Sequence, residues 1–129
     1  MNAAPRSPSP AELPRAAVRE RLAAERAGTL GQIEALQRDF DGIVAANALV
    51  AVDDEHDPDG SSTAFERAHV ASLLARAHDH LDALDRALER LEQGGYGLCE
   101  RCGRPIPAER LAVRPAATTC VTCAAAGPR

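Results

Sequence analysis

Aromatic residues are almost absent from this sequence. They make up 2% of its 129 residues, with one Tyr, two Phe and no Trp. A globular core normally draws much of its buried area from aromatic side chains. Here Ala, Leu and Val must supply that area, which suits a pair of packed helices better than a thick core. The composition therefore favours a mainly α-helical protein.

Lysine is absent as well, so Arg supplies all of the basic charge of the side chains. Fifteen Arg stand against 19 acidic residues, and the formal net charge is −4. Binding of nucleic acid by the whole chain needs basic surface that displaces counterions, so this balance argues against direct DNA binding. The acidic charge is uneven: residues 53–59 hold five acids and no Arg.

Long hydrophobic runs are also missing. No stretch reaches the length of a membrane span, and the N-terminal residues lack the apolar core of a signal peptide. We therefore expect no membrane partner and a cytoplasmic location. No Ser-His-Asp set, phosphate-binding glycine loop or paired acid–base arrangement stands out, so we expect no enzymatic activity.

The first half of the chain predicts a tail and one long helix. Residues 1–13 are rich in Pro and Ser, and we expect them to be disordered. From about Pro14 to Val50, apolar residues recur at steps of three and four, as on one face of a helix. Pro14 fits the first turn of that helix.

A second helix is predicted over about residues 64–93. Its apolar stripe follows an unbroken heptad seam from Val70 to Leu91. Thr63 and Glu66 match a capping box at its start. Two glycines, at positions 94 and 95, are expected to end it.

These two helices predict a fold. The connection between them is short, polar and acidic, so we expect an antiparallel coiled-coil hairpin over residues 14–93 with an acidic tip at 51–62. A parallel homodimeric coiled coil is the alternative, which the short turn disfavours. Dimerisation through remaining apolar surface stays open.

The four cysteines form two Cys-x2-Cys pairs separated by seventeen residues. Each pair presents two sulfurs from one tight turn, and two such pairs complete the tetrahedron that Zn²⁺ prefers. Residues 94–129 are therefore predicted to be a four-Cys zinc finger with a short tail. Four thiolates leave no open position, so the single zinc per chain is structural. Redox-active pairs are the alternative, but a thioredoxin-like context is missing. The predicted ligands are Cys99, Cys102, Cys120 and Cys123.

Further residues around the cysteines match a pattern known from other proteins. They are Gly95-Tyr96-Gly97, Cys99-Glu100-x-Cys102-Gly103, Ile106, Arg110-Leu111, Arg114-Pro115 and Cys120-x-x-Cys123. With them, the chain resembles the DksA/TraR family of zinc-finger proteins over about residues 64–123. The resemblance implies a transcription regulator that binds bacterial RNA polymerase through the secondary channel, often with the nucleotide ppGpp.

The resemblance also gives the acidic tip a role close to the polymerase active site. The best-known family members carry Asp-x-x-Asp-x-Ala there. In this sequence Asp54 and Asp57 have that Asp spacing, and Asp59 stands where Ala would be. These three are the candidate functional residues of the tip. A calcium loop from Glu55 to Glu66 is the alternative, disfavoured by the Glu at its first position and the lack of a second loop.

Two other functions stay open at this stage. The first is a redox- or zinc-responsive adaptor whose finger opens when its thiolates are oxidised. The second is a DNA-binding zinc finger. For either a protein or a nucleic-acid partner, the candidate contact residues of the finger are Arg101, Arg104, Arg110 and Arg114.

Overall fold

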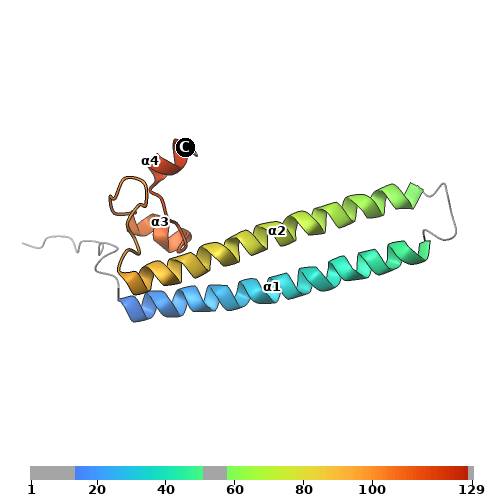
Figure 1. Cartoon of the computed structure of the whole chain (residues 1–129), viewed down its shortest axis with the longest axis horizontal. Helices are drawn as coiled ribbons and strands as arrows, with labels where there is room; N and C mark the ends of the chain where they lie inside the picture. The colour runs from blue at the N-terminus through green and yellow to red at the C-terminus, as the bar shows by residue number, and fades with distance from the viewer. Residues whose placement is uncertain (1–13, 51–57, 128–129) are drawn as a thin grey trace, which may run out of the picture. The chain divides into compact units, whose positions relative to one another are not determined.

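The computed structural model describes residues 14–50 and 58–127 (Figure 1). The predicted tail and the tip residues Asp54 and Asp57 lie outside the described residues. Asp59 is described only as part of a helix, not by its side chain. Within the described ranges the chain forms helices and no strand. The helices are α1 (Arg15–Val50), α2 (Pro58–Gln93), α3 (Ala108–Val113) and α4 (Val121–Ala125).

The mainly α-helical hairpin is confirmed. Near the start of α1, Arg15 and Arg19 pair with Glu92 at the end of α2. Further along α1, Arg26 Nε lies 2.5 Å from Asp85 Oδ1. Residue numbers rise along one helix as they fall along the other, so α1 and α2 run antiparallel within one chain.

The predicted start of the second helix is wrong by six residues. We expected a capping box at Thr63 and Glu66, but α2 begins at Pro58. Proline is favoured at the first helical position, where its missing N–H is not needed. Residues 58–62 of the predicted tip are therefore helical. A calcium loop running to Glu66 is excluded, because its second half lies in α2.

The end of α2 matches the prediction. Gly94 adopts a φ of 86°, which favours glycine, and its N–H donates to Leu91 O over 3.3 Å. The N–H of Gly95 donates to Arg90 O over 2.9 Å. This is the Schellman pattern, which satisfies carbonyls left free at a helix end. It turns the chain into the finger at the position that the two glycines predicted.

The chain divides into two compact units. In the unit that runs from Ala27 to Leu81, the heptad positions Leu74 and Ala77 are buried, and so is Thr29 of α1. The other unit combines the residues up to Arg26 with those from Asp82 onward. It contains the base of the hairpin and the whole finger.

In this second unit the finger and the hairpin base share one hydrophobic core. α1 contributes one side chain to it and α2 contributes three, while the finger supplies the rest. The core therefore crosses the boundary at residue 94 that separates hairpin and finger in the sequence. Its buried members are Leu22, Leu84, Ala87, Leu91, Tyr96, Cys99, Ile106 and Leu111.

Candidate metal centre

The first cysteine pair lies in a tight backbone turn. An isolated antiparallel bridge joins Leu98 to Pro105, and the N–H of Cys99 donates to Arg104 O over 2.8 Å. Gly103 closes the turn with an N–H bond of 2.9 Å to Cys99 O, at a φ of 74°. A side chain at this position would be strained in that conformation.

The second pair spans the start of α4. Cys120 is the residue that caps this helix, and its sulfur accepts the N–H of Cys123 over 3.5 Å. Just before it, the carbonyl of Thr119 accepts a 2.9 Å bond from Arg110 Nε of α3. The loop that carries Cys120 is thereby tied to α3 by a hydrogen bond that needs no metal.

The two pairs meet in one cluster. The four sulfurs lie within 4.8 Å of one another, and Cys102 Sγ is 3.8 Å from Cys120 Sγ. A tetrahedral zinc with Zn–S bonds of about 2.3 Å separates its sulfurs by about 3.8 Å. A disulfide would need about 2.05 Å, and all four cysteines are free. The spacing of the sulfurs therefore fits a shared metal ion.

The thiol pKa values of three cysteines in the cluster are shifted in different directions. Burial raises the pKa of Cys99, but N–H groups of Cys102, Cys120 and Arg101 outweigh it and lower the pKa to about 6. The N–H of Cys123 similarly lowers the pKa of Cys120. Hydrogen bonds with Cys120 and then Cys99 raise the pKa of Cys123 to about 12. Backbone amides thus stabilise thiolates at one cysteine of each pair, and thiolates are the form that binds metal.

The chemistry of this donor set points to zinc. Soft thiolates in a tetrahedral set of four suit Zn²⁺ or iron–sulfur chemistry, while Ca²⁺ and Mg²⁺ require oxygen ligands. When bound, the ion crosslinks the two pairs and contributes folding free energy, without an open coordination position for a substrate.

Two of the four arginines considered as contact residues serve the finger itself. Arg101 Nη1 donates to Cys123 O over 2.9 Å and to Gly127 O over 2.5 Å, which joins the two cysteine pairs. Arg110 holds the loop before Cys120, as described above. The side chains of Arg104 and Arg114 form no hydrogen bond or ion pair with any described residue, so they are the two that remain available to a partner.

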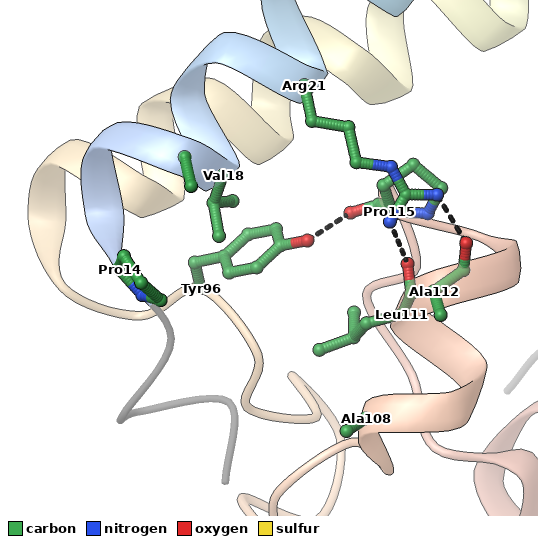
Figure 2. Close-up of a pocket in the computed structure, with 9 residues that line it drawn as sticks. Pro14, Val18, Arg21, Tyr96, Ala108, Leu111, Ala112 and Pro115 are labelled. Carbon is green, nitrogen blue, oxygen red and sulfur yellow. Dashed lines mark hydrogen bonds between the residues drawn. The ribbon is translucent and has the colours of Figure 1, made fainter. Parts of the chain in front are cut away.

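The finger is held on the hairpin base by polar contacts that the sequence did not reveal (Figure 2). Within the finger, Tyr96 Oη donates to Pro115 O over 2.7 Å. Arg21 of α1 donates to Leu111 O over 3.2 Å and also to Ala112 O, at the end of α3. A mainly apolar pocket of about 210 Å³ lies between these groups. Arg21 lies off the apolar stripe of α1, so no local pattern marked it.

The family comparison matches the finger. Residues 94–126 fit the model of the prokaryotic DksA/TraR C4-type zinc finger. The chain is 40% identical over 63 residues to the RNA polymerase-binding transcription factor DksA of Caulobacter vibrioides, which covers 49% of this chain and 44% of that protein. It is 38% identical over 66 residues to the uncharacterized protein YteA of Bacillus subtilis, covering 51% and 28%. The chain thus spans less than half the length of these relatives.

The fold comparison extends beyond the finger. The structure of transcription factor DksA2 from Pseudomonas aeruginosa matches with a TM-score of 0.70 and 29% identity, over 87% of this chain and 81% of that one. The predicted resemblance is therefore confirmed by sequence and by structure. Among the described helices, none is both long enough and apolar enough to cross a membrane.

Proposed function

We propose that the chain is a member of the DksA/TraR family of C4-type zinc-finger proteins and that it regulates transcription by binding bacterial RNA polymerase. The hairpin enters the secondary channel of the enzyme, and the finger anchors the hairpin base. The observation that carries this proposal is the four-sulfur cluster in a finger that shares its core with an antiparallel hairpin.

The zinc site has a structural part in this function. One zinc per chain is bound by Cys99, Cys102, Cys120 and Cys123. The ion fixes the two cysteine pairs, and the finger in turn fixes the base through Tyr96 and the shared core. Because four thiolates complete the shell, the site performs no hydrolysis, and the protein acts by binding instead of by catalysis.

The acidic tip carries the regulatory part. Asp54, Asp57 and Asp59 approach the polymerase active centre, where carboxylates are suitable partners for basic side chains or for magnesium. The nucleotide ppGpp is the proposed co-regulator at the polymerase interface, and the cytoplasm is the location that this partner requires. Direct DNA binding is not part of the proposal, because the chain is acidic overall.

The test uses the zinc-loaded chain and purified bacterial RNA polymerase. We expect direct binding and a change in transcript yield in a purified assay, with and without ppGpp. A variant with Cys99→Ser and Cys120→Ser should lose both effects together with its zinc. Absence of polymerase binding by the zinc-loaded chain would overturn the proposal.

The same samples separate the two alternatives. DNA shifted by the chain without polymerase would favour a DNA-binding finger. Zinc release under mild peroxide, coupled to a change in a partner other than polymerase, would favour a redox-responsive adaptor. Neither result is expected.

A further inference from the structure

The outer face of α2 carries a large apolar side chain close to the helix start. Phe65 is 83% exposed, and it is one of only two Phe residues in the chain. The buried stripe of α2 in the same unit contains Leu74 and Ala77. At 3.6 residues per turn, Phe65 lies about 180° around the helix from Leu74. It therefore cannot join the seam of the hairpin.

The surroundings of Phe65 are polar or small. Ser62, Glu66 and His69 line a shallow depression together with it. Further along the same outer face, Ser72 is exposed as well. The aromatic ring is thus an isolated apolar feature with a polar border, and no described part of the chain covers it.

A second exposed apolar residue occurs in the same compact unit. Leu49, near the end of α1, is 78% exposed. In the described part of this unit, it and Phe65 are the only large apolar residues with more than half of their surface exposed. Both flank the acidic segment at residues 51–57 in sequence. The two exposed apolar residues of this unit therefore lie on either side of an acidic segment in the sequence.

We propose that Phe65 anchors the hairpin to the protein wall of the polymerase channel, in an apolar pocket bordered by basic side chains. This inference rests on the proposed function. Aromatic side chains surrounded by polar ones are typical of the residues that dominate binding energy. Charge selects the border of the pocket, because Glu66 lines the same depression as the ring. A basic border complements this carboxylate, while an acidic surface such as DNA repels it.

The test measures the affinity of full-length, zinc-loaded variants for purified polymerase. Phe65→Ala should weaken binding by about tenfold or more, as truncation of an anchor residue does. Phe65→Leu, which keeps apolar bulk, should retain most of the affinity. Ser72→Ala, on the same outer face, is the matched control and should leave the affinity unchanged. Because Phe65 is exposed, all three variants should show the melting curve of the parent.

A photoreactive phenylalanine analogue at position 65 identifies the occupant. We expect a crosslink to a polymerase subunit, lost when unlabelled parent chain competes. An unchanged affinity of Phe65→Ala would overturn the inference, even if the parent binds polymerase and the proposed function stands. A crosslink between two copies of this chain, with a dimer in sedimentation that Phe65→Ala dissolves, would also overturn it. If the parent itself fails to bind polymerase, the proposed function fails first and the inference falls with it.

Discussion

The hydroxyl of Tyr96, at the start of the finger, donates a hydrogen bond of 2.7 Å to the carbonyl of Pro115, nineteen residues further along the chain. Pro115 is buried and lies on the path to the second cysteine pair. The ring of Tyr96 belongs to the core that also contains Leu22 of α1. One residue thus connects two parts of this unit: the hairpin base and the turn after α3.

Tyr96 gives a direct spectroscopic readout of that connection, because it is the only Tyr and the chain has no Trp. Burial raises the pKa of its phenol above the usual 10.0, partly opposed by Arg21 and reinforced by Glu25. We expect the absorbance at 295 nm to titrate above pH 10.0 in the folded chain and at about 10 in denaturant. A raised folded pKa stabilises the fold fully below pH 10.0, and this stabilisation is lost as pH rises through the folded value. Identical titration in both states would contradict the buried placement.

Replacement of Cys99 or Cys120 by Ser should abolish zinc binding. Each change removes one of four sulfurs, one from each pair, and leaves an incomplete coordination shell. Metal analysis of the parent should give one zinc per chain, and either variant should give nearly none. Arg104→Ala is the matched control, because its side chain is exposed in the same turn and forms no hydrogen bond or ion pair with any described residue. Stoichiometric zinc in a Cys→Ser variant would mean that the ligand set is wrong.

Chelation of zinc should affect the two compact units unequally. The unit from Ala27 to Leu81 contains no finger residue, so we expect its helices to persist without the metal. The other unit shares its core with the finger and should loosen. We expect most of the far-UV helical signal to survive a strong chelator, while the fluorescence of Tyr96 changes. Complete loss of helicity would show that hairpin and finger fold as one.

The seam of α2 should be most sensitive where it is completely buried. Leu84 has 0% of its surface exposed and packs in the shared core, whereas Leu81 is half-buried. Leu84→Ala should reduce the free energy of unfolding by about 2–5 kcal/mol, and Leu81→Ala by less. The reason is that truncation of a fully buried side chain leaves a larger cavity than truncation of a half-buried one. Thermal and urea unfolding of the two variants measures the difference. An equal cost at both positions would contradict the packing described above.

The sequence predicted those parts of the fold that have a local sequence pattern. The heptad seam from Val70 to Leu91 and the glycines after it fixed the identity and end of α2. The spacing of the cysteines identified a cluster whose sulfurs indeed meet. Each of these signals lies within one helix or one turn, so no tertiary information was needed to interpret it.

The parts that sequence missed depend on contacts between distant segments. Leu22 fits the apolar stripe of α1 only loosely, yet it is fully buried because the finger covers it. Arg21 is exposed, and its role depends on the carbonyls near the end of α3, which are distant in sequence. The start of α2 was misplaced because a capping-box pattern at Thr63 competed with a proline start at Pro58. The finger also draws on a core beyond its own residues: Val113 is 81% exposed, while the hairpin base supplies buried side chains to the shared core.

The last prediction concerns the acidic tip, which should matter for regulation and little for folding. Five acids within residues 53–59 repel one another, so their charge is a net cost to the isolated protein that salt partly screens. Replacing Asp57 and Asp59 by Asn removes two of these charges and preserves the shape of each side chain. We expect the double variant to be at least as stable as the parent and to bind polymerase with similar affinity, because the finger and the helix faces supply most of the contact area. It should nevertheless lose the effect on transcription, since the carboxylates are the groups proposed to act at the active centre.

The matched control for the tip is Asp79→Asn with Asp82→Asn, which removes the same charge from exposed positions on α2. Both acids lack a hydrogen bond or ion pair from their side chains to any described residue. The control should bind and regulate like the parent. A loss of regulation in the tip variant alone would then result from the position of the removed charges and not from the change in net charge. The measurement is therefore paired: affinity for polymerase, and transcript yield in a purified assay at fixed salt. If the tip variant regulates like the parent, the acidic segment is only a connection between α1 and α2, and the regulatory part of the proposed function fails while polymerase binding stands.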